Sequence, residues 1–381
     1  STFAFYGSAE QYYTDAIYNI VNYYPFDGTK EDHINWYLSS SYIDTSLFKQ
    51  CWPSYLGSAH LDGSQYIDFY AGAQAIPEVR YVGKIRNSEP GIVIDPKQGN
   101  TAEFWLKKAS VSPGSSPEVI FDIGTYPGKA SEDKYAKFKL FLSSSATGSP
   151  LYVSYYTGAT GSSETENINL GNKEVTNDSI GDSKWHHYGI SATQVDGKVV
   201  FKLYIDGQWN CTKKITTTTD MPRIDSLMGG RLGSSYEETP GQLITAGFDD
   251  FRFWKGSRTS REISRWFDKR VYASRLTNED YNSSLGLYYN FNKPPVGVQQ
   301  KDQLIIDYSG NEIVGKIENY SSMVILAISA VEQSQATENS EEPTPVIDPT
   351  DPSVIRMASK LRKTSTFAFY GSAEQYYTDA I

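Results

Sequence analysis

Residues 185–254 decide the fold, and their clearest segments read WHHYGIS (185–191), VVFKLYIDG (199–207), MGGRLG (228–233) and GFDDFRFW (247–254). The first two segments alternate apolar and polar residues with a period of two and are bounded by Gly, Asp or Asn. This pattern predicts half-buried antiparallel strands. Asp206 and Gly207 lie between two such runs and predict a hairpin turn.

The order and spacing of these segments resemble the second half of a laminin G-like, concanavalin A-type domain. Residues 60–69 resemble the early strand pair of that family, 101–108 its next core strand, and 257–263 its final helix turn. The resemblance covers residues 21–267 and implies an all-β fold, a concanavalin A-like antiparallel β-sandwich jelly roll with short flanking helices. It says little about function, because this fold carries lectins, hydrolases, adhesion modules and virion components.

Composition limits the partners open to the chain. It has 381 residues, of which 29 are Tyr, and a formal net charge of −10. Tyr suits sheets with one wet face, and the acidic balance argues against nucleic-acid binding. Cys51 and Cys211 are the only cysteines, and the sequence leaves their redox state open. The longest mostly apolar run, 323–330, is too short to cross a bilayer, so we expect no membrane span.

An identical segment, STFAFYGSAEQYYTDAI, occupies residues 1–17 and 365–381. Chance does not produce such a repeat, so we interpret the sequence as periodic: one unit starts at residue 1 and the next copy starts at residue 365. Two origins stay open: a tandem array of near-identical units, or an artefact of cloning or excerpting. Because the chain begins with Ser rather than Met, we expect it to be a piece of a longer polypeptide.

Composition and pattern divide the chain into six parts. We predict a helical junction over 1–20, the β-sandwich over 21–270, an appended strand unit over 271–330, an acidic Pro-rich linker over 331–352, a short basic helix over 353–364 and the start of the next repeat over 365–381. The appended unit is a partial echo, because LYYNFN (287–292) is similar to NYYPFD (22–27).

The sequence carries no pattern of a catalytic site. Paired carboxylates on one strand, which glycoside hydrolysis requires, are missing, as are zinc spacings, a nucleophile elbow and a phosphate loop. His186 and His187 are neighbours on a strand, so they point to opposite faces and cannot chelate one ion side by side. We interpret them as structural and predict that the chain is not an enzyme; a glycoside hydrolase is the least favoured alternative.

A metal site is predicted from the resemblance. In related domains an Asp within the last core strand can bind Ca²⁺ together with loop carbonyls, and Ca²⁺ takes six to eight oxygen ligands. The candidate calcium ligands are Asp62, Asp68, Asp249 and Asp250. The alternative is that Asp250 caps its strand or pairs with Arg252 or Arg231. No cofactor is required in either interpretation.

Aromatic side chains supply candidates for stacking on sugar rings. We favour the loop residues Trp209 and Tyr236 over Trp36, Tyr155 and Tyr156. Most aromatic residues of a Tyr-rich sheet protein are ordinary packing, which is the competing interpretation for all five.

Two classes of function remain. In the first, the chain is a structural repeat of a fibre or virion protein, because residues 257–356 resemble, in order, a combination found in tailed-bacteriophage structural proteins. Head-to-tail assembly with copies of itself and with other virion or fibre proteins would follow, at a virion surface or in an extracellular fibre. An apolar strand beside a linker suits addition to a neighbour's sheet edge. The residues predicted to leave their own unit are Met323, Val324, Ile325, Leu326 and Ile328.

In the second class, the sandwich recognises a host-surface glycan with the help of calcium, as an adhesin module of a bacterial surface protein. Repeated units would then multiply weak sites by avidity. The two classes overlap, because a phage fibre can also bind glycans.

Overall fold

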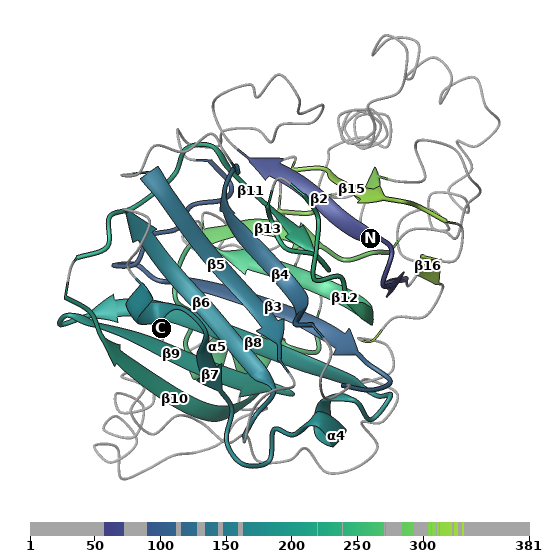
Figure 1. Ribbon diagram of the computed structural model, residues 1–381, viewed down its shortest axis with the longest axis horizontal. Helices are drawn as coiled ribbons and strands as arrows, with labels where there is room; N and C mark the ends of the chain where they lie inside the picture. The colour runs from purple at the N-terminus through teal and green to yellow at the C-terminus, as the bar shows by residue number, and fades with distance from the viewer. Residues whose placement is uncertain are drawn as a thin grey trace, which may run out of the picture.

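The computed structural model contains two antiparallel sheets packed face to face (Figure 1). It describes residues 57–71, 90–111, 116–127, 134–143, 148–158, 163–218, 220–237, 239–269, 271, 284–292, 304–305, 307–309, 311, 313–321, 324–326 and 330. The predicted junction (1–20), linker (331–352), basic helix (353–364) and second copy of the repeat (365–381) lie outside these residues, as do Trp36 and Cys51.

Sheet A has eight strands within the described residues, in the order β10-β9-β8-β3-β12-β1-β16, with β13 also paired to β12. The strands are β1 (Ser58–Asp62), β3 (Asn100–Lys107), β8 (Trp185–Val195), β9 (Lys198–Ile205), β10 (Gln208–Thr216), β12 (Thr245–Trp254), β13 (Leu285–Tyr289) and β16 (Ile325–Leu326). The long strand β12 pairs with β1 along residues 245–248 and with β13 along 251–254.

Sheet B, again counted over the described ranges, has eight strands in the order β14-β15-β2-β11-β4-β5-β6-β7. The strands are β2 (Tyr66–Ala71), β4 (Glu118–Thr125), β5 (Tyr135–Leu142), β6 (Leu151–Gly158), β7 (Ile168–Leu170), β11 (Met228–Leu232), β14 (Leu304–Ile305) and β15 (Gly315–Glu318). Among the described residues there are also three short helical segments: η3 (Ser163–Thr165), α4 (Asn177–Ile180) and α5 (Ser260–Trp266).

The strands predicted from the 185–254 stretch are confirmed as β8, β9, β11 and β12, and the all-β sandwich is confirmed with them. The hairpin turn between β9 and β10 is confirmed as well. Asp206 and Gly207 have φ values of +50° and +73°. Both are left-handed, as the tightest two-residue hairpin turn requires, and Asp-Gly tolerates that backbone.

The core between the sheets is aromatic. Phe104 on β3 and Phe251 on β12 meet Phe121 on β4 across the sandwich, with ring centroids 6.0 and 5.8 Å from Phe121. Phe138 and Tyr155 extend this contact across sheet B, at centroid distances of 5.1 and 5.2 Å. Each fully buried ring of this kind contributes about 1.5–3 kcal/mol. Tyr155, weighed above for sugar stacking, therefore belongs to the core.

Helix α5 covers the outer face of sheet A and confirms the helix turn predicted over 257–263. Its start is fixed by a capping box: Thr259 Oγ1 accepts from Glu262 N, and Thr259 N donates to Glu262 Oε2. The buried Ile263 of the helix packs over Gly189 of β8. Because the helix closes this face, β3 is buried on both sides along almost its whole length.

The strands between 285 and 326 complete both sheets: β13 and β16 join sheet A, and β14 and β15 join sheet B. This differs from the predicted boundary, which placed 271–330 in an appended unit. The fully buried Asp307 secures the arrangement, since its carboxylate accepts from the backbone N–H of Tyr288, Ser309 and Ile313 at 2.8–3.0 Å. Over the described residues, no helix has the length and apolar character needed to span a membrane.

Candidate functional site

The outer face of sheet B carries alternating polar and aromatic side chains and is turned toward the viewer in Figure 1, where β4, β5 and β6 lie in front of sheet A. Along β2 and β5, half-buried residues alternate with buried core residues. The outward side chains of these two strands are Tyr66, Asp68, Tyr70, Tyr135, Lys137, Lys139 and Phe141. A sheet with one face on the core and one facing water gives this period-two pattern.

A row of alternating charge crosses four strands of this face. The strand register places Arg231 of β11 between two acidic residues, Asp68 of β2 and Asp122 of β4. Asp122 in turn lies opposite Lys139 of β5. Arg231 Nε donates to Asp68 Oδ1 at 3.0 Å. Opposite charges on directly paired residues stabilise a sheet, so this row orders the face without leaving a bare charge at its centre.

The loop 234–242 folds over the middle of the row. Tyr236 N donates to Asp122 Oδ2 at 3.0 Å, and Arg231 Nη1 donates to the carbonyls of Ser235 and Glu237. Lys137 Nζ lies 3.5 Å from Asp122 Oδ2 and 2.9 Å from Glu237 Oε1. Burial raises the pKa of Asp122, against the opposing charges of Lys137 and Lys139. The loop is therefore fastened to the sheet by buried polar contacts.

Tyr236, predicted to stack on sugars, lies on this face but is only 4% exposed. Its ring is 6.3 Å from Tyr70 and 6.2 Å from Tyr126, and Arg231 lies 5.5 Å from its centroid. Any side chain at Gly229 would overlap the Tyr236 hydroxyl. Tyr236 thus supports the sheet face from within the loop and presents little ring surface to a ligand.

Two stacked aromatic pairs stand on β5 and β6. Tyr135 and Tyr156 have centroids 5.6 Å apart with an interplanar angle of 14°, and Phe141 and Tyr152 have 5.6 Å and 21°. Tyr135 and Tyr152 are half-buried, so one ring of each pair keeps solvent-facing surface. Lys139 stands between the pairs, with Nζ 5.3 Å from the Phe141 centroid.

These pairs were missed by sequence reasoning, apart from Tyr156, which was ranked below Trp209 and Tyr236. A signal was present in YAKFKLFL (135–142), which places Tyr, Lys, Lys and Phe at every second position. What the sequence lacked was the neighbour relation between β5 and β6, which sets Phe141 opposite Tyr152.

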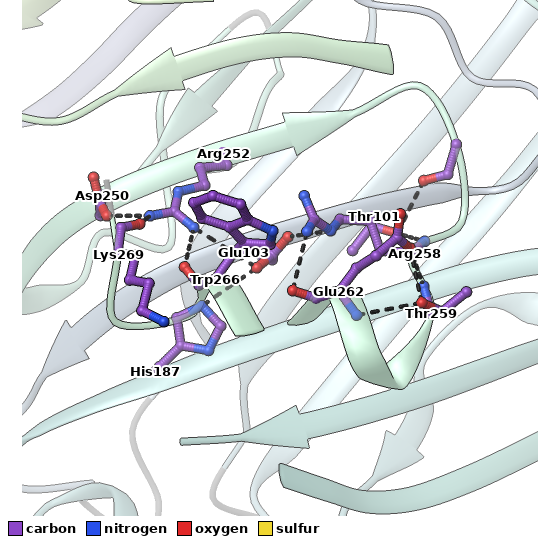
Figure 2. A network of polar contacts seen from close by, with 11 residues as sticks. Thr101, Glu103, His187, Asp250, Arg252, Arg258, Thr259, Glu262, Trp266 and Lys269 are labelled. Carbon is purple, nitrogen blue, oxygen red and sulfur yellow. Dashed lines mark hydrogen bonds and ion pairs between the residues drawn. The ribbon is translucent and has the colours of Figure 1, made fainter. Parts of the chain in front are cut away.

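A second polar cluster lies beneath α5 on the other side of the sandwich, and Figure 2 shows its members converging on Glu103. Arg258 Nε lies 3.2 Å, His187 Nε2 3.6 Å and Arg252 Nη1 4.0 Å from the Glu103 carboxylate. All four residues are at most 5% exposed. Burial, followed by the nearby Arg252 and Arg258, lowers the pKa of His187 well below its usual value, so the ring is neutral. This cluster is closed to ligands and acts as internal structure.

Asp249 and Asp250, predicted calcium ligands, are buried and already occupied by protein donors. Asp249 accepts from the backbone N–H of Asp250 at 2.8 Å and of Ala330 at 2.7 Å. Asp250 pairs with Arg252 and accepts from the Tyr288 hydroxyl at 2.6 Å. The structural alternative, pairing of Asp250 with Arg252, is thus what the fold contains.

Asp62 and Asp68, the other two predicted ligands, lie elsewhere. Asp62 accepts from Ser64 N and Oγ at 2.9 and 2.6 Å and from Gln65 Nε2 at 2.9 Å. Asp68 is in sheet B and holds Arg231, whereas Asp249 is in sheet A. Throughout the described ranges, no three His, Cys, Asp or Glu residues are arranged to hold a metal ion.

The other candidate residues lie away from the aromatic pairs. Trp209 is on β10 of sheet A, half-buried, and its Nε1 donates to Thr212 Oγ1 at 3.1 Å. His186 contacts Asp206 at 2.8 Å and Asp182 at 3.2 Å. The hydrogen bond to Asp206, opposed by burial, raises the pKa of His186 to about 9. Cys211 is a free thiol.

The predicted assembly segment docks on its own sandwich. β16 pairs with β1, matching Leu326 with Ser58 and Ile325 with Ala59, and Val324 is buried in the core. His60 N donates to the carbonyl of Val324 at 2.6 Å. This corrects the expectation that the segment leaves its unit: the strand addition occurs within the chain. Met323 and Ile328 lie outside the described residues.

Comparison with known proteins supports the fold. Residues 85–264 match the family model of the concanavalin A-like lectin/glucanases superfamily. A comparison with curated protein sequences gives no match.

Many solved structures are similar to this chain, and three of them show how low the sequence identity is. A Bacteroides ovatus protein to which carbohydrate binding has been attributed is 15% identical with a TM-score of 0.41, and the match covers 72% of this chain and 60% of that one. The Ruminococcus gnavus IT-sialidase CBM40 bound to α2,3 sialyllactose is 12% identical with a TM-score of 0.34, covering 56% and 98%. Tailspike protein 2 of the Escherichia coli O157:H7 bacteriophage CAB120 is 13% identical with a TM-score of 0.33, covering 52% and 24%.

At these identities and TM-scores the three structures say nothing about what this chain binds. The family match and the two-sheet architecture agree with each other: the chain contains a concanavalin A-like β-sandwich.

Proposed function

We propose that the chain is a non-enzymatic glycan-binding unit and that the outer face of sheet B is its binding surface. One observation carries this proposal: two stacked aromatic pairs stand on β5 and β6 with lysines between them. A sugar ring presents C–H groups on its face and hydroxyls at its rim. Aromatic rings beside hydrogen-bonding side chains complement both parts.

The dimensions of the surface fit a short oligosaccharide. Tyr135 and Phe141 are six residues apart on β5, which corresponds to about 20 Å of strand. The face between them carries the half-buried Lys139, whereas the ammonium of Lys137 is held by Asp122 and Glu237. The loop carrying Tyr236 is fastened by buried contacts, so the surface is preorganised and little ordering entropy opposes binding.

Glycan-array binding with the full chain, followed by affinity measurements on Tyr152→Ala, tests the proposal. We expect Tyr152→Ala to weaken binding about tenfold, or 1.4 kcal/mol. Trp209→Ala, a matched aromatic truncation on sheet A, is the control and should leave affinity unchanged. The proposal fails when no glycan binds, or when Trp209→Ala weakens binding as much as Tyr152→Ala.

The same measurement separates this proposal from calcium-assisted recognition. Binding to the outer face of sheet B should persist in a chelator, because the Asp68 and Asp122 carboxylates of this face are already engaged by Arg231 and by the backbone N–H of Tyr236. Loss of binding on chelation, restored by Ca²⁺, would instead support a role for Asp62, Asp68, Asp249 and Asp250.

A second candidate function is favoured by the identity of residues 1–17 and 365–381. In this proposal the chain is one structural repeat of a fibre, either of a virion such as a bacteriophage tail fibre or of a bacterial surface adhesin. Repetition would then present several glycan-binding faces and increase avidity. Negative-stain imaging of the native assembly, with the mass of the parent polypeptide, tests it. A beaded fibre supports the array, and compact single units overturn it.

A further inference from the structure

Lys139 differs from the other cations on the outer face of sheet B in its partners. The others each contact a carboxylate: Lys137 with Glu237 at 2.9 Å, Arg231 with Asp68 at 3.0 Å, and Lys316 with Glu318 at 2.6 Å. Over the described part of the chain, the Lys139 ammonium has only a neutral hydrogen-bond partner, Gln242 Oε1 at 2.8 Å. An ammonium has three donors, so two remain for a ligand.

The surroundings of Lys139 strengthen its attraction for an anion. Its stem is half-buried, and its Nζ lies over the ring of Phe141. Burial and the like charge of Lys137 lower the pKa of Lys139, while the carboxylates of Asp122, Glu237 and Glu166 oppose this effect. A partly desolvated ammonium interacts more strongly with an anionic partner than a fully hydrated one, because the local dielectric constant is lower.

The position of Lys139 relative to the aromatic pairs matches one sugar residue. Phe141 follows Lys139 by two positions on the same face of β5, which is about 7 Å along the strand. Tyr152 stacks on Phe141 and keeps exposed surface. A sugar ring placed against Tyr152 would therefore hold a substituent over the Lys139 ammonium.

The overall charge of the protein does not by itself favour acidic ligands. The formal net charge is −10, so the long-range field repels polyanions. Any selectivity for an acidic ligand must then come from a local, partly buried contact. Lys139 is the cation on this face whose ammonium bonds to a neutral acceptor among the described residues, while the carboxylates of Asp122, Glu237 and Glu166 act on its charge without a hydrogen bond to it.

We propose that the outer face of sheet B selects glycans that carry an acidic group, a carboxylate or a sulfate, and that Lys139 binds this group while the Phe141–Tyr152 pair holds the sugar ring. This inference rests on the proposed glycan-binding function and adds the chemical class of the ligand and the residue that recognises it.

The test measures affinities of the full chain for matched oligosaccharide pairs, such as oligogalacturonate and its methyl ester, or lactose with and without a sulfate. We expect the acidic member to bind about tenfold more tightly through a charge-assisted contact. Lys139→Met keeps the apolar stem over Phe141 and removes the charge, so it should lower affinity for the acidic member more than for the neutral member and abolish this preference. Lys316→Gln removes one positive charge from the same sheet face and is the matched control.

The possible outcomes are separable. Equal binding of acidic and neutral members overturns this inference and leaves the proposed glycan-binding function intact. A preference for acidic members that Lys316→Gln reduces as much as Lys139→Met also overturns it, since the effect would then be general charge. Absence of binding to every glycan overturns both proposals.

Discussion

Replacing Glu103 by Gln tests the interpretation of the closed cluster beneath α5 as internal structure. Glu103 is fully buried, and its closest charged partner is Arg258, with Nε 3.2 Å away. At an effective dielectric constant near 20 this pair attracts by about 5 kcal/mol. The side chains are also desolvated in the folded state, so we expect the net loss found for breaking a buried pair, about 3–5 kcal/mol. Gln conserves the volume, so no cavity contributes to the loss.

The assay is denaturant unfolding followed by tryptophan fluorescence, with the midpoint and slope measured for each variant. Glu318→Gln is the control. Glu318 pairs with Lys316 at 2.6 Å, but both side chains are at least 30% exposed, so its loss should cost about 0–1 kcal/mol. The double variant Glu103→Leu with Arg258→Met should recover stability, because an apolar pair of similar volume removes both buried charges. Equal stability of Glu103→Gln and Glu318→Gln would refute the reasoning.

Three further predictions concern turns and titrating groups. Gly207→Ala should lower the free energy of unfolding by more than about 2 kcal/mol, because its φ is +73° and a Cβ would overlap Phe267. Gly197→Ala is the control: its φ is +69° but the space around it is open, so it should lower the free energy of unfolding by about 1 kcal/mol. Burial raises the pKa of Asp307 from 3.8 to about 6. The free energy of unfolding should therefore fall by about 2 kcal/mol as the pH rises from 4 to 6, and Asp307→Asn should remove that slope. Because the pKa of His186 is raised, its stabilising contribution is complete below pH 6.5 and is lost as the pH rises to about 9. The free energy of unfolding should therefore depend less on pH across this range in His186→Gln than in the unchanged protein.

The fold was accessible from the sequence because period-two alternation and turn residues act locally. Asp206 and Gly207 specify their hairpin without reference to any other part of the chain. Strand order is different in kind. No local pattern near residues 135–142 or 151–158 predicts that β5 pairs with β6. The position of Phe141 beside Tyr152 could therefore be seen only in the structure.

The partners of Asp249 and Asp250 also could not be predicted from the sequence, because they come from distant segments. Asp249 and Asp250 stand at a β-bulge, where Asp250 has φ +52° and the pairing with β3 shifts register. The bulge turns both carboxylates toward buried donors that come from distant segments, Ala330 and Tyr288. A sequence shows the acidic pair but not these partners, which decide whether oxygens stay available for an ion.

The arrangement of the two sheets makes the two proposed functions, glycan binding and fibre repetition, compatible with each other. β16 adds to β1 at one end of sheet A, and Ala330 donates to Asp249 of β12 on that sheet, so the described chain ends against sheet A. The aromatic pairs stand on β5 and β6, toward the β7 edge of sheet B (Figure 1). Sheet A is closed on its outer face by α5 and a buried charge cluster, whereas the polar residues of sheet B brace one another and leave Lys139 and Tyr152 partly exposed. In the proposed function, sheet A would enclose and connect the unit, and the outer face of sheet B would bind the ligand.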